Sequence, residues 1–293
     1  MIKCQLKRYY KSRFTLVLTG ILILFTGLSF YLMHERRLEI LQQYNEAALD
    51  TSADVLEQFV RSFEMGIFYF EYFVHPGIIN DFVEIIWWII IGLFGAYLSG
   101  QIFMDMQSNY GAFIISRMSY GKYFIKTIIA QCLYMTTYLL SFYGLVFLGA
   151  ILIIGGGIAI PPLVNIQGSQ TIANYLWFIW SPIFLGIVFT VTTVLFATVS
   201  CVFIRNKYLL QVLPFSYLIG MPFIVFVVWG INPTLGNFLS YFSMGHAFQG
   251  LGQKMRFGNI INEWILAYPV VISCVIILVS IVNIRKFSKE YII

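Results

Sequence analysis

The sequence predicts an all-α, polytopic integral membrane protein with six transmembrane helices. Its 293 residues are 59% hydrophobic and only 11% charged, whereas about a quarter of an ordinary soluble domain is charged. So few charges cannot cover a water-facing surface of this size, which makes lipid the solvent for most of the chain. Aromatic residues reach 18%, as expected where Phe faces lipid and Tyr and Trp lie at the interfaces. We therefore expect a multi-pass protein of the cell membrane.

Six apolar runs are long enough to cross a bilayer, which takes about 20 helical residues. They cover residues 14–33, 83–104, 127–154, 175–204, 208–231 and 264–284. A stretch rich in Gly and Pro at residues 154–162 ends the third run. A polar turn of Arg205, Asn206 and Lys207 separates the fourth run from the fifth. Gly and Pro clusters and short polar turns are the usual breaks between helices.

Residues 1–13, before the first span, have the pattern of a short basic amphipathic helix. Ile2, Leu6 and Tyr9 recur at helical spacing, and lysines recur four residues apart on another face, at Lys3, Lys7 and Lys11. We predict a cytosolic amphipathic helix on the inner leaflet, with a disordered basic flank as the alternative.

The remaining connections are predicted from charge and apolar spacing. Residues 34–82 include nine of the chain's 13 acids, and their apolar spacing predicts an extracellular acidic loop with amphipathic helices. Residues 105–126 are too polar to span and too apolar to lie free in water, so we expect a cytosolic helix parallel to the membrane. Residues 155–174 and 232–263 are predicted to be extracellular, and residues 285–293 form a cytosolic tail.

Positive charge predicts that both termini lie inside. With the N-terminus in the cytosol, the inner segments hold 13 of the 18 basic residues and only two of the 13 acids. The opposite orientation would reverse this bias, against the rule that cytosolic loops of membrane proteins are rich in Lys and Arg.

The sequence lacks the motifs of several classes of enzyme and nucleotide-binding protein. We find no GxxxxGK[ST] phosphate loop, HExxH zinc motif or GxSxG nucleophile motif, so we expect no catalytic residue, no metal and no cofactor. No ionisable Asp, Glu, Lys, Arg or His occurs between Lys126 and Arg205, which argues against a proton-coupled carrier. Sodium sites built from backbone carbonyls stay open. We therefore expect that the chain is not an enzyme and has no nucleic-acid partner, and that any uphill transport by it takes its energy from another subunit.

Residues 105–126 carry a spaced pattern of polar, glycine, apolar and basic residues. The pattern resembles the segment after the second span of type-2 ABC transporter permeases, where it forms the coupling helix. The resemblance implies a helix that docks in a groove of a separate cytosolic ATP-binding subunit, and a Lys that opens the third span. The matching residues are Asp105, Gln107, Gly111, Phe113, Arg117 and Lys126.

A second stretch, residues 239–262, resembles the same family. His246, Phe248 and Gly252 match a pattern that the family carries in short re-entrant helices before the last span. By this resemblance the segment 232–263 is re-entrant, and His246 and Phe248 are candidates for an extracellular gate. The alternative for His246 is an ordinary interfacial or packed histidine.

Spans three and four carry neutral polar side chains in otherwise apolar runs. They have two interpretations, the lining of a polar but uncharged conduit or hydrogen bonds between neighbouring helices. The candidates for conduit lining are Tyr134, Thr137, Tyr138, Thr190 and Thr193.

The resemblance implies the type-2 ABC exporter fold, with six spans per subunit and export driven by a separate ATPase. We expect the membrane subunit of an exporter that moves an amphipathic or hydrophobic cargo outward, such as a peptide, an antibiotic or a lipid-linked molecule. One copy offers only one wall of a pathway, so a second permease subunit, identical or homologous, is expected. Family analogy places that interface on spans one and five. The alternatives are an autonomous channel or secondary carrier, or a non-transporting membrane immunity factor or enzyme.

Overall fold

The regular elements of the computed structural model are all helical over the residues that it describes, which are 1–47, 69–70, 81–107, 119–154, 172–204, 206–243 and 263–290. This confirms the all-α prediction for that part of the chain. The helices are α1 (Ile2–Tyr10), α2 (Arg13–Ala47), α5 (Asp81–Gln107), α7 (Tyr120–Gly149), α8 (Ile172–Val199), α9 (Lys207–Ile231), α10 (Pro233–Ser240) and α12 (Glu263–Glu290).

Five helical stretches are long and apolar enough to cross a membrane. They are Arg13–Leu32, Ile89–Met106, Tyr120–Ile154, Lys207–Ile231 and Ala267–Lys286. The remaining predicted span, residues 175–204, falls on α8, in which Ile183–Val199 is a shorter apolar helical stretch. Five such helices indicate a multi-pass membrane protein.

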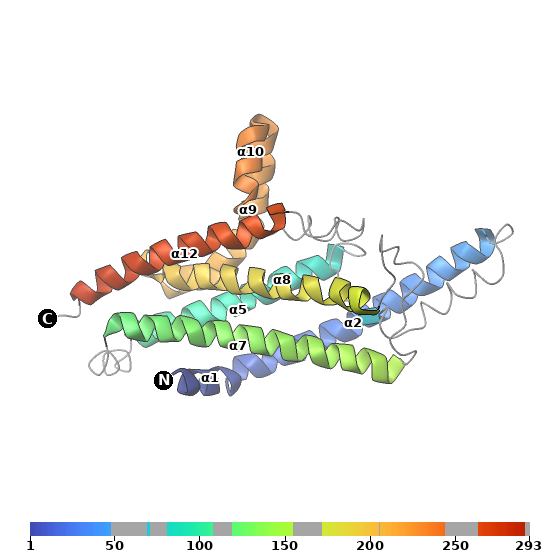
Figure 1. Cartoon of the computed structure of the whole chain (residues 1–293), viewed down its shortest axis with the longest axis horizontal. Helices are drawn as coiled ribbons and strands as arrows, with labels where there is room; N and C mark the ends of the chain where they lie inside the picture. Colours follow the sequence, from blue (N-terminus) through green and yellow to red (C-terminus); the bar gives the residue numbers. More distant parts are fainter. Residues whose placement is uncertain are drawn as a thin grey trace.

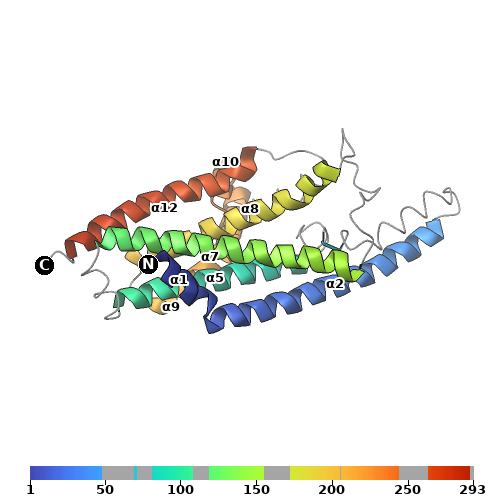
Figure 2. The same cartoon turned by 60° about the horizontal axis from the view of Figure 1, so that its bottom comes forward.

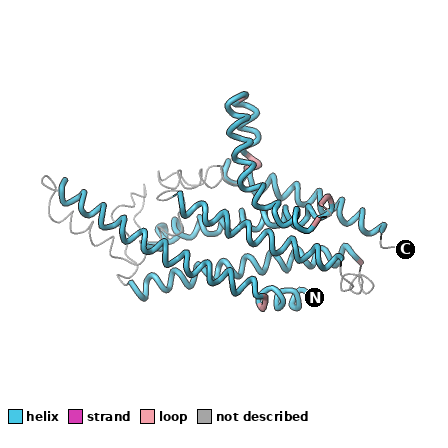
Figure 3. The backbone as a smooth tube through the Cα atoms, turned by 180° about the vertical axis from the view of Figure 1, so that it is seen from behind, coloured by secondary structure: helices cyan, strands magenta, loops and turns pink. Residues whose placement is uncertain are grey.

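The long helices lie side by side in an elongated bundle (Figure 1). Helix α5 is flanked by α2, α8 and α9, and α8 also contacts α7 and α12. Successive long helices run in alternating directions along the bundle, so the end of α5, the start of α7 and the end of α12 lie toward one end of it (Figures 1 and 3). The N-terminal helix α1 lies at the same end.

Helices α5 and α9 approach closely because α5 presents glycines to α9. A Cβ atom built on Gly95 would lie 2.5 Å from Cγ of Pro214, and one built on Gly92 would lie 2.3 Å from the ring of Phe215. A Cβ atom built on Gly100 would lie 2.7 Å from Nε2 of Gln211 on α9. Small residues allow the backbones of membrane helices to pack in this way, so these glycines fix how α9 lies on α5.

The chain reverses direction at Asn232, between α9 and α10. The Asn232 side chain accepts hydrogen bonds from the backbone N–H groups of Thr234 and Leu235, which caps α10. Helix α10 packs back against α9, where the indole N–H of Trp229 donates to Asn237 at 3.2 Å. The two helices form a hairpin, and α10 stands away from the long axis of the bundle (Figure 1). Residues 244–262 of the predicted re-entrant segment lie outside the described residues.

Candidate functional site

The N-terminal helix α1 is held against the bundle by its own polar and aromatic side chains. It lies beside α7 and reaches the end of α5 (Figure 2). Gln5 and Tyr9 are the buried residues of this helix, at 5% and 2% exposure, whereas Lys3, Lys7 and Lys11 are exposed. The chain is helical over Ile2–Tyr10 as predicted, and the buried face of this helix is bound to protein; its place on the inner leaflet stays a prediction.

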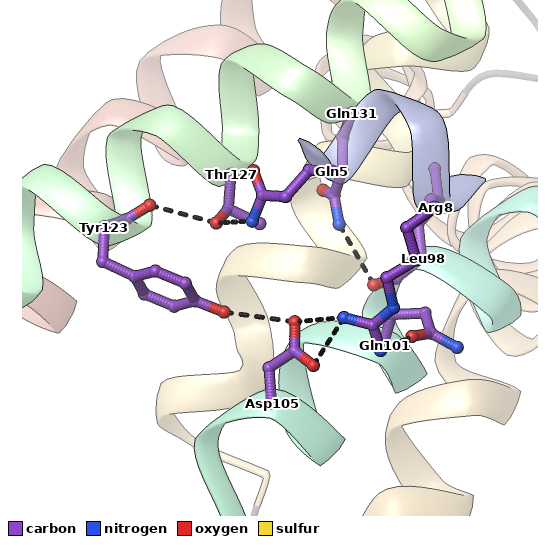
Figure 4. Close-up of polar contacts among 8 residues, drawn as sticks. All are labelled: Gln5, Arg8, Leu98, Gln101, Asp105, Tyr123, Thr127 and Gln131. Atoms are coloured by element: carbon purple, nitrogen blue, oxygen red, sulfur yellow. Dashed lines mark hydrogen bonds and ion pairs between the residues drawn. The ribbon is translucent and has the colours of Figure 1, made fainter. Parts of the chain in front are cut away.

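An ion pair joins α1 to α5. The Arg8 guanidinium donates through Nη1 to both oxygens of Asp105, at 2.8 and 2.9 Å, and through Nη2 to the side-chain oxygen of Gln101 (Figure 4). The Tyr123 hydroxyl of α7 donates to Asp105 Oδ2 at 3.2 Å. One carboxylate thus gathers donors from α1 and α7 at the end of α5.

Burial makes this ion pair important for the position of α1. The Asp105 side chain is 8% exposed and that of Arg8 is 42% exposed, so the carboxylate has little access to water and depends on its protein partners. Partial burial alone would lower the pKa of Arg8, but the hydrogen bond and charge of Asp105 outweigh it and the pKa is raised. Burial raises the pKa of Tyr9, so its phenol stays neutral.

Further hydrogen bonds extend the polar cluster from α1 to α8. Gln5 Nε2 donates to the Thr127 hydroxyl of α7 at 2.7 Å. Gln131, one turn further along α7, donates to the Leu98 carbonyl of α5 at 3.1 Å and accepts from the Thr198 hydroxyl of α8 at 3.1 Å. These bonds cross between helices, so α1, α5, α7 and α8 are tied together at one end of the bundle. Figure 4 shows the bonds among α1, α5 and α7.

The structure describes three of the six residues that were matched to the coupling helix, and these three lie at the end of α5 and near the start of α7. Asp105 lies inside the polar cluster, with its carboxylate bound to Arg8 and Tyr123 and not directed at a free surface. Lys126 is half-buried on α7, next to Thr127, and Gln107 is the last residue of α5. Gly111, Phe113 and Arg117 lie outside the described residues, so docking by this segment stays a prediction.

Sequence reasoning did not identify Arg8, Gln101 or Tyr123 as partners of Asp105. One signal was available, because Asp105 is the only Asp or Glu between Glu84 and Glu263. A lone carboxylate at the end of an apolar run needs a cation or several donors. The sequence offered many basic residues near the same side and did not show which one would reach it.

The candidates for conduit lining form hydrogen bonds within the chain. The hydroxyls of Tyr134 and Tyr138 on α7 each lie 2.7 Å from a threonine hydroxyl of α2, at Thr15 and Thr19. Tyr134 is fully buried. These pairs are bonds between helices, as the second interpretation of the polar side chains expects.

The other three candidates also form hydrogen bonds within the chain, two of them between helices and that of Thr190 inside α8. Thr137 lies within hydrogen-bonding distance of the Tyr10 hydroxyl of α1. Thr190 donates to the Gly186 carbonyl of its own helix at 2.7 Å, and the Thr193 hydroxyl lies 2.7 Å from that of Tyr268 on α12. A conduit at these positions stays a prediction that involves a second subunit.

The candidates for an extracellular gate, His246 and Phe248, lie outside the described residues. Within the described ranges, no group of three or more His, Cys, Asp and Glu side chains lies close enough together to hold a metal ion. No protein-family model, curated protein or solved structure matches the chain.

Proposed function

We propose that this chain is the membrane subunit of an ABC exporter, with six spans and both termini in the cytosol. A separate ATP-binding subunit would supply the energy, and the cargo would be amphipathic or hydrophobic. Aromatic and uncharged helices favour such a cargo over an ion. The end of the bundle that carries α1 and the Arg8–Asp105 pair would face the cytosol.

The polar cluster at the end of α5 is the observation that carries the proposal. Asp105 lies two residues before the end of α5, and the segment that resembles a coupling helix follows directly. The contacts of Asp105 with α1 and α7 hold together the two helices that enter and leave that segment. A push from an ATPase on residues 108–118 would therefore be transmitted to α1, α5 and α7 as a unit.

The surface of α2 and α9 supports a second membrane subunit. Both helices flank α5 and have exposed apolar side chains, among them Leu16 and Leu24 on α2 and Phe226 on α9. Gly220 and Gly230, which the sequence suggested for close approach, have no atom within 4 Å of a built Cβ. Close approach within the chain uses the glycines of α5, which leaves those of α9 free to meet a partner.

Purification in native-like lipid tests the proposal. A tagged chain is expected to bring down a cytosolic ATPase, and the mass of the complex should correspond to two membrane subunits and two ATP-binding subunits. Transport by the chain reconstituted alone would contradict the proposal, as would a stable transport-competent complex with a single membrane subunit.

Labelling of engineered cysteines tests the orientation. Ser119 is exposed at the start of α7, so Ser119→Cys should react with a membrane-impermeant maleimide only in inside-out vesicles. The exposed thiols, Cys4 and Cys274, are replaced beforehand. Asp50→Cys, in the predicted acidic loop, is the matched control and should react only in intact cells. The reverse pattern would overturn the orientation and the coupling role of residues 108–118.

A further inference from the structure

We propose that the outer face of α1 is a binding surface for anionic phospholipid headgroups. This inference needs only the membrane-spanning helices and does not depend on an ATPase partner. It rests on Lys3 and Lys7 of α1 and on Lys11, which caps the C-terminus of α1, on the exposure of these lysines and on the way the opposite face is fixed to the bundle.

The lysines share one face because of their spacing. Lys3, Lys7 and Lys11 are four residues apart, and a helix turns once in about 3.6 residues. Gln5 and Tyr9, which are buried, lie roughly half a turn from the centre of this face. The lysine face therefore points away from α5 and α7.

Charge decides what this face would bind. All three lysines are exposed, and no carboxylate of the described residues forms an ion pair with them. The basic residue of α1 that does pair with an acid is Arg8, on the flank of the helix. Three unpaired ammonium groups on one face complement a negative surface.

The place of α1 next to a candidate span indicates that the negative surface is a membrane. Helix α1 ends at Tyr10 and the candidate span of α2 begins at Arg13, so α1 lies at the end of a span, at headgroup depth. A basic residue near an anionic membrane surface contributes about 1 kcal/mol, or roughly a fivefold preference for anionic over neutral lipid. The bonds of Gln5 and Arg8 hold the helix in place before lipid binds, which reduces the ordering cost of binding.

Cys4 offers a local probe of lipid at this face. It is exposed and lies next to Lys3. The full chain, with the other exposed thiol removed by Cys274→Ala, is labelled at Cys4 with a fluorophore and reconstituted in phosphatidylcholine vesicles. Quenching is then compared for phosphatidylglycerol and phosphatidylcholine that carry a nitroxide near the headgroup.

The expected result is a preference of about tenfold or more for phosphatidylglycerol, which weakens in high salt because surface charges are screened. The triple variant Lys3→Gln/Lys7→Gln/Lys11→Gln should bring the ratio close to one, while Lys3→Arg/Lys7→Arg/Lys11→Arg should preserve it. The matched control replaces Lys122, Arg285 and Lys286, which are exposed basic residues outside α1, with Gln.

The control distinguishes a specific face from net charge. If the control variant loses the preference as fully as the α1 variant, the general charge of the protein attracts the lipid and the proposal fails. Equal quenching by the two lipids in the unsubstituted protein would also overturn it. Relief of quenching by millimolar inorganic phosphate would show a site for free phosphate, which contradicts a lipid surface.

Discussion

Arg8→Ala is expected to lower the free energy of unfolding by about 2 kcal/mol. Removing one partner of a fully buried pair costs roughly 3–5 kcal/mol, because the other charge stays buried without compensation. Arg8 is 42% exposed, so part of its interaction is already screened and the expected loss is smaller. Unfolding in mixed micelles, followed by tryptophan fluorescence, measures the change.

The matched control for Arg8 is Lys7→Ala. Lys7 is the neighbouring residue on the same helix and is exposed, so its loss should change stability by no more than about 0.5 kcal/mol. Equal effects of the two substitutions would show that Arg8 contributes only as a surface charge. The double variant Arg8→Met/Asp105→Leu should recover most of the lost stability, because a buried ion pair can be replaced by apolar side chains without a net cost.

The double variant Arg8→Met/Asp105→Leu also separates the effect of the ion pair on stability from its effect on the transmission of movement from an ATPase. It should keep α1 packed on α7 but removes the charged contact at the end of α5. If the ion pair transmits movement from an ATPase, this stable variant should lose cargo-stimulated ATP hydrolysis while still binding the ATPase. Full stimulation would show that packing alone joins α1 to the coupling segment.

Helix positions were predictable because they depend on local properties of the chain. The apolar run of residues 208–231 nearly coincides with α9, which spans Lys207–Ile231. The polar turn before α9 was also predictable from the sequence. In the structure, Asn206 of this turn accepts hydrogen bonds from the N–H groups of Tyr208 and Leu209 and caps α9. Helix α2 runs past the predicted span to Ala47, because the polar residues after position 33 are compatible with a helix outside the lipid.

The partners of polar side chains could not be predicted in the same way. Arg8 and Asp105 are 97 residues apart, and the packing of α1 against α7, beside the end of α5, brings them together. The tyrosines of span three illustrate the same limit, because their spacing is equally compatible with a conduit and with bonds to α2. Which hydroxyl meets which helix depends on tertiary packing that a single sequence does not encode locally.

Gly95→Ala is expected to destabilise the protein by about 2 kcal/mol, within the 1–3 kcal/mol typical of overpacking. The added methyl group would lie 2.5 Å from Cγ and 2.7 Å from Cβ of Pro214. A proline ring is fixed to its own backbone, so it cannot rotate aside, and the strain must shift α9 relative to α5. Since α9 contributes the exposed apolar face proposed for the second subunit, a smaller fraction of dimer is expected as well.

Gly144→Ala on α7 is the matched control for Gly95→Ala, because a Cβ built on Gly144 has no atom within 4 Å. Alanine is a better helix former than glycine by about 1 kcal/mol, so this variant should be neutral or slightly more stable. The Gly95→Ala substitution is therefore expected to destabilise the protein, whereas Gly144→Ala is not.

Pro214→Gly removes both contacting ring atoms, and a double-mutant cycle with Gly95→Ala should show a favourable coupling of about 0.5–3 kcal/mol. Additive effects in that cycle, or equal effects at positions 95 and 144, would mean that the glycines of α5 do not set the packing of α9.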